Sequence, residues 1–216
     1  MKSHIRNILS RAGILPTVDL ARRLPEIAAW LRQGCVGVAP APVKRLVLSA
    51  YLKKYSISNF VETGTHLGDT LAFVARDRNV AATSIELDEQ YFSAASGRFA
   101  AYPNVTLLQG DSGKVLPSLV ERIKAPTLFW LDGHYSGAGT GRGELDTPVS
   151  AELESILSSS VNGHVVLIDD ARLFNGEDDY PHLDRLLELV RENGKFEIEV
   201  STDIVRLTPV TPGHAQ

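Results

Sequence analysis

From Asn59 onward, short apolar runs alternate with stretches of helical periodicity, and this alternation limits the fold more than any other feature of the chain. The apolar runs cover residues 60–61, 82–87, 105–108, 127–131 and 165–168. The helical stretches cover residues 70–77, 89–101, 112–123 and 149–159. Largely apolar strands that alternate with helices are typical of a parallel sheet covered on both faces. The sequence therefore predicts an α/β fold.

The last part of the chain departs from this alternation. After a helical stretch at residues 181–193, two strand-like segments at 196–200 and 204–207 are joined by the tight sequence Ser201-Thr202-Asp203, which predicts an antiparallel hairpin. Ligands of open parallel sheets bind beyond the carboxyl ends of the strands, where the strand order reverses. The residues that end each strand are therefore the first candidates for a site.

The residues before the alternating pattern predict a helical extension. Apolar residues recur at helical spacing in three segments, 5–9, 18–31 and 43–55. Thr17 is the expected cap of the second helix, and Pro25 should either kink that helix or mark its first turn. We predict an N-terminal helical extension over residues 1–56 and a second unit over residues 57–216.

Charge divides the chain at the same place. Residues 1–56 contain ten Lys or Arg and two acids, a balance of +8, so the remaining residues carry −12 to reach the net charge of −4. Such a split favours docking of the basic helices on an acidic partner, an anionic substrate, a membrane surface or another copy of the chain. The alternative is that these charges lie on solvated helix faces, where single charges contribute little.

Composition excludes several classes of protein. With 44% hydrophobic and 22% charged residues, a chain of 216 residues can bury a full core. Cys35 is the only cysteine, which excludes an intramolecular disulfide framework. No stretch approaches the roughly 20 uninterrupted apolar residues of a membrane helix, and the N-terminus lacks the apolar region of a signal peptide. We expect a cytoplasmic protein with no nucleic-acid partner.

The first predicted strand ends in a turn that contains two glycines, Gly64 and Gly68. Glycine lets a backbone approach a ligand closely, where a Cβ atom would collide with it. The dinucleotide-binding fingerprint G-x-G-x-x-G has its middle glycine where this chain has His66. The turn therefore favours a ligand other than a dinucleotide, and the alternative is a tight strand-to-helix turn without any ligand.

The second and third strands end in further polar residues. Glu86 follows Gly64 by 22 residues, and a carboxylate at the tip of the second strand can accept hydrogen bonds from both hydroxyls of a ribose. Asp111 and Ser112 end the third strand, where they can meet an adenine amino group. The alternatives are a solvated acid for Glu86 and a helix N-cap for Asp111.

The fourth and fifth strands end in a group of acids and a histidine. Asp132 and His134 follow the fourth strand, and Asp169 and Asp170 follow the fifth. The glycine-rich loop at residues 136–147 is long for a compact domain and is typical of an active-site lid. These side chains should converge between the two strands, which makes this the predicted chemical centre.

Taken in order, the strand-end motifs resemble those of the class I S-adenosylmethionine-dependent methyltransferases over roughly residues 59–209. The motifs are E-T-G-T-x-x-G, S-I-E-L-D, L-Q-G-D-S, W-L-D-G-H and I-D-D. The resemblance implies a Rossmann-like, mostly parallel sheet of seven strands that is closed by an antiparallel strand. It also implies that S-adenosylmethionine is held by Glu62, Gly64, Thr65, Gly68, Glu86, Asp111 and Ser112. The glycine turn departs from the family pattern because it has fewer glycines than the commonest form.

Methyl transfer requires alignment of the acceptor with the methyl group and removal of a proton from a hydroxyl acceptor. His134, with Asp132, is the predicted catalytic group for that proton. Asp132, Asp169 and Asp170 are alternative ligands for Mg²⁺, in the manner of the catechol-type and macrocin-type O-methyltransferases that the arrangement resembles. A third interpretation is that Asp170 caps a helix or pairs with Arg172.

The resulting expectation is O-methylation of a small-molecule or sugar-like hydroxyl. One rival is a nicotinamide-dependent oxidoreductase, which the absent fingerprint argues against. Another is a docking protein that keeps the fold without catalysis and acts through its basic N-terminal helices.

Overall fold

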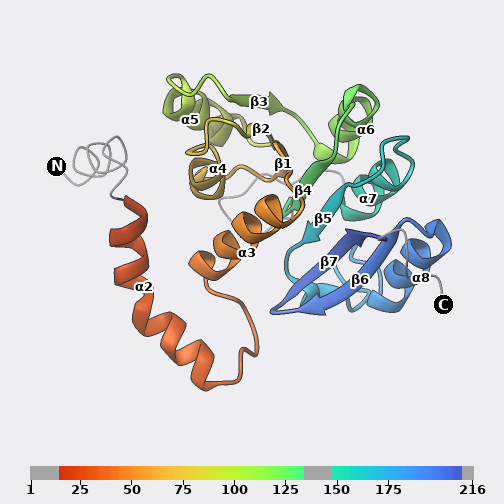
Figure 1. The fold of residues 1–216 in the computed structure, drawn as a ribbon, viewed down its shortest axis with the longest axis horizontal. Helices are drawn as coiled ribbons and strands as arrows, with labels where there is room; N and C mark the ends of the chain where they lie inside the picture. The colour runs from red at the N-terminus through yellow and green to blue at the C-terminus, as the bar shows by residue number, and fades with distance from the viewer. Residues whose placement is uncertain (1–14, 134–146, 211–216) are drawn as a thin grey trace.

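The computed structural model describes residues 15–133 and 147–210, and it contains a seven-stranded sheet (Figure 1). The strands are β1 (Asn59–Thr63), β2 (Ala81–Glu86), β3 (Val105–Gln109), β4 (Thr127–Leu131), β5 (Val165–Ile168), β6 (Phe196–Ser201) and β7 (Ile204–Pro209). Their order in the sheet is β3-β2-β1-β4-β5-β7-β6. β1 to β5 are parallel, whereas β7 is antiparallel to both β5 and β6. The predicted α/β class, the mostly parallel seven-stranded sheet and the terminal hairpin are confirmed.

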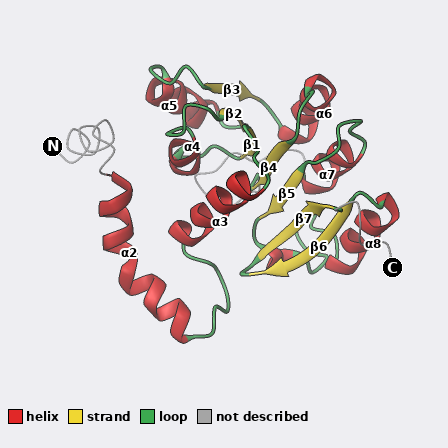
Figure 2. Ribbon diagram, in the orientation of Figure 1, coloured by secondary structure: helices red, strands yellow, loops and turns green. Residues whose placement is uncertain are grey.

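Helices cover both faces of the sheet (Figure 2). They are α2 (Leu15–Arg32), α3 (Ala41–Lys54), α4 (Asp69–Val74), α5 (Glu89–Phe99), α6 (Ser112–Arg122), α7 (Val149–Leu157), α8 (Leu183–Asn193) and the short 3₁₀ helix η1 (Ala171–Leu173). The core on one face contains side chains of α3, α4 and α5, and the core on the other contains side chains of α6, α7 and α8. None of these helices is long and apolar enough to cross a membrane.

Alternation along the strands builds these two cores. In β4, Phe129 and Leu131 face the core of α6 to α8, whereas Leu128 and Trp130 face the core of α3 to α5. Successive side chains of a strand point to opposite faces, so a central strand between two helical layers is apolar throughout. All five residues of β4 are buried, which explains why its sequence shows a continuous apolar run.

The β6–β7 hairpin closes through a two-residue turn. Thr202 and Asp203 both have positive φ, 53° and 62°, between the paired residues Ser201 and Ile204. Two central residues with positive φ are characteristic of the type I′ turn, whose twist matches that of the flanking strands. The turn therefore allows direct antiparallel pairing, as predicted from its length.

The N-terminal helices differ from the predicted ones at their boundaries. α2 begins at Leu15, so the expected cap, Thr17, lies inside the helix, and that prediction was wrong. Pro25 also lies inside this 18-residue helix rather than in its first turn, and Figure 1 shows that α2 bends along its length. An interior proline removes one backbone hydrogen bond and clashes with the preceding turn, which explains the bend. The helix predicted at residues 5–9 lies outside the described residues.

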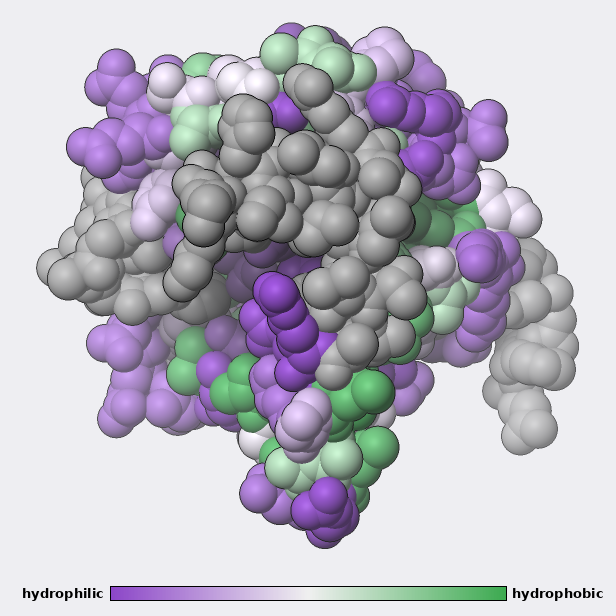
Figure 3. Space-filling view, turned by 90° about the vertical axis from the view of Figure 1, so that its left-hand side faces the viewer, coloured by the Kyte–Doolittle hydropathy of each residue, from purple (hydrophilic) through white to green (hydrophobic). Residues whose placement is uncertain are grey.

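α3 packs on the sheet, whereas α2 extends away from it (Figure 1). Leu48 of α3 is fully buried in the same core as Phe60 of β1 and Leu167 of β5. Leu24 and Leu31 of α2 are each 56% exposed. Figure 3 views the molecule from the left-hand side of Figure 1, and the lower part of that view shows apolar surface beside hydrophilic surface. The division of the chain at residue 56 stays a prediction.

Candidate active site

The carboxyl ends of the parallel strands bring the predicted site residues to one edge of the sheet. β1 pairs with β2 on one side and with β4 on the other, so the strand order reverses between β1 and β4. Glu62 lies at the end of β1, Glu86 ends β2 and Asp132 directly follows β4. This edge is where open α/β sheets bind ligands.

The glycines of the first turn are required by contacts within the protein. Gly64 has φ +82°, and a Cβ there would lie 2.6 Å from the backbone oxygen of Asp132. Gly68 has φ +71°, and a Cβ there would lie 2.8 Å from the ring of Phe99. Both positions favour glycine on conformational and steric grounds. Gly64 therefore lets β1 and β4 approach each other, and Gly68 lets the turn pack against α5, so the two glycines do not by themselves indicate a ligand.

Glu62 is buried beneath this turn and is held by hydroxyl groups. The Ser84 hydroxyl donates to Glu62 Oε2 at 2.7 Å, and the oxygens of Thr65 and Ser84 are 2.6 Å apart. Burial raises the pKa of Glu62 to about 8, against the lowering effect of the Ser84 hydrogen bond. Ser84 was quoted in the sequence motif but was given no role there. The structure makes it the link between Glu62 and the turn.

Glu86 joins the tip of β2 to the glycine turn. Its Oε2 accepts a 2.7 Å hydrogen bond from the backbone amide of His66, and its Oε1 accepts one of 2.9 Å from the amide of Asp88. A carboxylate has about four lone-pair sites. Each oxygen of Glu86 therefore retains capacity for a ribose hydroxyl, and the two amides hold the carboxylate in place.

Asp111 and Ser112 start α6. Asp111 is the N-cap, and its Oδ1 accepts a 3.0 Å hydrogen bond from the amide of Gly113. The capping role predicted as an alternative is therefore present. Ser112 is buried, and its Oγ would lie 3.3 Å from a Cβ placed at Gly133. The start of α6 thus contacts the segment that follows β4.

The acids after β4 and β5 converge, and a lysine from α3 enters their group. The Nζ atom of Lys44 donates to Asp169 Oδ2 at 2.5 Å and lies 3.4 Å from Asp170 Oδ1. Arg172 Nη1 donates to the same Asp170 oxygen at 2.8 Å. Burial raises the pKa of Asp132 well above its usual range, and the charge of Asp169 raises it further. The ion pair between Asp170 and Arg172, one of the predicted alternatives, is present.

The arrangement of these acids does not fit a metal centre. Within residues 15–133 and 147–210, no group of three or more Asp, Glu, His or Cys side chains is placed to hold a metal ion. The oxygens of Asp169 and Asp170 bind the cations of Lys44 and Arg172 instead. Burial is the largest single effect on the pKa of Lys44 and lowers it, but the charge and hydrogen bond of Asp169, together with the charges of Asp170 and Asp132, leave the pKa raised.

Glu152 of α7 is a buried acid that sequence reasoning missed. The residue is 1% exposed, and its Oε1 has no hydrogen-bond partner among the residues that the structure describes. Burial raises its pKa to about 7, and the nearby hydroxyls of Ser112 and Thr63 partly offset this. The sequence does contain a sign of this burial, because Glu152 lies on the apolar stripe of α7 that includes Val149 and Leu153.

The predicted base, His134, lies outside the described residues, as does most of the predicted lid at residues 136–147. Thr147 is described and buried, and its Oγ1 accepts a 3.4 Å hydrogen bond from the amide of Val149. Thr147 therefore contributes a hydrogen bond at the start of α7, whose N-cap is Pro148.

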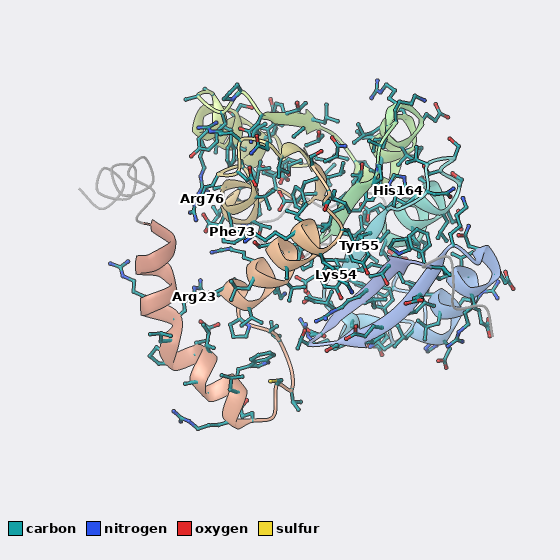
Figure 4. The ribbon with its side chains drawn as sticks, in the orientation of Figure 1. Arg23, Lys54, Tyr55, Phe73, Arg76 and His164 are labelled. Carbon is teal, nitrogen blue, oxygen red and sulfur yellow. The ribbon has the colours of Figure 1, made fainter. Side chains whose placement is uncertain are left out.

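A buried histidine at the opposite edge of the sheet has a structural role (Figure 4). Nδ1 of His164 accepts a 3.1 Å hydrogen bond from the amide of Thr127, so the ring proton lies on Nε2 and is directed to the Ser159 hydroxyl at 3.0 Å. A base must present a lone pair to the serine proton. His164 therefore ties β5 to β4 and does not activate Ser159.

The comparisons with solved structures identify the fold. An O-methyltransferase, TomG, from Streptomyces achromogenes, involved in tomaymycin synthesis and in complex with SAM, is 19% identical over 86% of this chain and 87% of its own, with a TM-score of 0.60. An O-methyltransferase from Bacillus cereus in complex with SAH is 17% identical over 89% of this chain and 90% of its own, with a TM-score of 0.61. The chain has the class I S-adenosylmethionine-dependent methyltransferase fold.

The same methyltransferase fold also occurs with a nucleic-acid substrate. The 23S rRNA methyltransferase ErmE is 16% identical over 77% of this chain and 68% of its own, with a TM-score of 0.51. The sequence matches no protein-family model and no curated protein. The fold alone therefore does not specify the class of acceptor.

Proposed function

We propose that this protein transfers the methyl group of S-adenosylmethionine to a hydroxyl oxygen of a small-molecule or sugar-like acceptor. The observation that carries the proposal is Glu86, whose carboxylate is held at the tip of β2 by two backbone amides and keeps free lone pairs. That position suits a ribose diol. Both reported O-methyltransferases share the fold and are in complex with SAM or SAH.

In this proposal the cofactor lies across the carboxyl ends of β1 to β3. The turn that contains Gly64, Thr65 and Gly68 takes the methionine part, with buried Glu62 beneath it. Asp111 and Ser112 border the adenine. The oxygens of Asp111 are the natural acceptors for an amino group, since only one of them is used by the α6 cap.

The chemical step is an in-line displacement. The acceptor oxygen attacks the methyl carbon, the carbon–sulfur bond breaks, and the sulfur keeps the electron pair. The acceptor proton passes to a base, for which His134 and Asp132 are the proposed residues.

Calorimetric titration with S-adenosylhomocysteine and with NAD tests the proposal. We expect S-adenosylhomocysteine to bind and NAD not to bind. Glu86→Ala should weaken S-adenosylhomocysteine binding by about tenfold or more, or about 1.4 kcal/mol. Glu89→Ala, which removes an exposed acid three residues away, is the matched control. Binding of NAD alone would contradict the proposal and favour an oxidoreductase.

We also infer that the N-terminal helices bind a second copy of this chain. Leu24, Leu31 and Val36 are 56%, 56% and 71% exposed on α2 and the segment that follows it. The excess charge of +8 in residues 1–56 is complementary to the −12 of the remaining chain. A second copy offers that acidic surface, and apolar contact supplies the affinity.

A further inference from the structure

On α3, the side chain of Lys44 reaches Asp169 and Asp170, the two acids that follow β5. Its side chain is 15% exposed, and the side chains of Asp169 and Asp170 are 4% and 9% exposed. The two contacts join residues 125 and 126 positions apart in the chain. Leu48, one turn later on α3, is fully buried in the core and fixes the helix against the sheet.

We propose that the Lys44 ammonium is the resident cation of the acceptor site and takes the place there of a divalent metal ion. The inference rests on the proposed methyltransferase function and specifies it as metal-independent. Lys44 is a positioning residue: it fixes Asp169 and Asp170 and offsets the negative charge around Asp132.

The contacts at the acids support an ammonium over a metal. Mg²⁺ requires near-octahedral oxygen ligands at about 2.0–2.1 Å, and Ca²⁺ requires six to eight oxygens at about 2.3–2.6 Å. Here Asp169 Oδ2 is taken by Lys44, and Asp170 Oδ1 accepts from Lys44 and from Arg172. A divalent ion would have to displace the partly buried Lys44 from both acids and the exposed Arg172 from Asp170.

Through Lys44, a helix from the N-terminal part of the chain contributes to the candidate active site. The acids come from the ends of β4 and β5, whereas the ammonium comes from a helix that precedes β1. Neither part can form the neutralised group alone. Displacement of α3 would leave carboxylates buried beside one another without their cation, which is unfavourable.

The test measures the response of folded protein to divalent cations in the absence of any acceptor. Thermal unfolding is recorded with millimolar MgCl₂ and with KCl at equal ionic strength, and Mn²⁺ binding is measured by calorimetry. Wild-type protein should respond equally to the two salts. Lys44→Ala should unfold roughly 10 °C lower and should regain several degrees in MgCl₂ alone.

Three further variants separate this role from ordinary stabilisation. Lys44→Arg keeps the cation and should show no MgCl₂ response. Lys53→Ala removes an exposed lysine of the same helix and should behave as wild type. If Lys44→Ala does not fold, Lys44→Met combined with Asp169→Asn removes one charge of each sign and should gain the response through Asp132 and Asp170.

The proposal is overturned if wild-type protein binds Mn²⁺ or is stabilised by MgCl₂ beyond KCl. It is also overturned if the folded variants that lack Lys44 gain no response. S-adenosylhomocysteine binding, measured on the same samples, reports on the proposed function separately. Its absence from wild-type protein would remove the methyltransferase assignment and leave the cation result intact.

Discussion

The Ser84 hydroxyl donates a 2.7 Å hydrogen bond to the carboxylate of Glu62, although burial raises the pKa of that carboxylate to about 8. The two residues lie on neighbouring strands and are direct partners in the register of β1 and β2. The glycine turn thus rests on an acid that is largely protonated at neutral pH in the protein alone. An approaching ammonium group, such as that of the methionine part of the cofactor, would favour its ionised form.

The first prediction concerns the dependence of stability on pH at Glu62. Its pKa is about 8 in the folded protein and about 4.5 when unfolded, so the unfolded chain loses its proton first and this site's contribution to stability falls as pH rises from 4.5 to 8. Glu62→Gln should remove that dependence. Urea unfolding at pH 9 should show the variant more stable by on the order of 2–4 kcal/mol, with little difference at pH 5.

Glu121→Gln is the control for Glu62, because Glu121 is exposed on α6. It should leave the pH dependence of wild-type protein unchanged. Equal stability of Glu62→Gln and wild type at both pH values would show that Glu62 is ionised at no free-energy cost.

The second prediction concerns Gly64, where a Cβ would lie 2.6 Å from the backbone oxygen of Asp132. Gly64→Ala should lower the free energy of unfolding by about 2–4 kcal/mol, through positive-φ strain and the forced separation of β1 from β4. Gly97→Ala is the matched control, since Gly97 lies in α5 and its Cβ would meet nothing within 4 Å. It should stabilise by about 0.5–1 kcal/mol, and a similar loss in both variants would contradict the steric argument.

The third prediction concerns acid denaturation and His164. Burial lowers the pKa of His164 to about 4 from the ordinary 6.5. The unfolded chain therefore takes up this proton first as pH falls, and the stabilisation present above pH 6.5 is lost progressively between pH 6.5 and 4. Wild-type protein should lose up to about 3 kcal/mol across this range from this site.

Comparison of His164→Gln with His182→Gln isolates that effect. His182 is exposed at the start of α8. The His164 variant should be less stable than wild type at pH 7 and should show a flatter profile between pH 6.5 and 4. An unchanged slope would place the acid sensitivity elsewhere in the protein.

The fourth prediction concerns self-association through the N-terminal helices. Light scattering should give a mass near twice the 23.5 kDa of one chain. Leu24→Glu combined with Leu31→Glu should yield a monomer, because charges would replace the exposed apolar contacts. Val200→Glu alters a 45% exposed residue on β6 and should leave the dimer intact. A monomeric wild-type protein would refute the proposed pairing.

Much of the fold could be predicted because its signals are local. The continuous apolar run at 127–131 coincides with β4, since both faces of this strand are buried and apolar side chains are favoured at every position. The short connection at Thr202-Asp203 also predicted the hairpin from a local signal. A connection of two residues lets the flanking strands pair only with each other, in the antiparallel direction. The start of α2 was misplaced, since a capping residue such as Thr17 is only one of several ways to begin a helix.

The sequence by itself determined which acids stand at the strand ends, because parallel strands carry their carboxyl ends to one edge of the sheet. Only the tertiary structure decided what those acids contact. Lys44 lies 125 residues from Asp169, in a helix whose apolar periodicity gives no sign of the ion pair. Gly64 is likewise required by the backbone of Asp132, a neighbour that exists only once β1 and β4 are paired. Such contacts depend on packing between distant segments, which local periodicity does not encode.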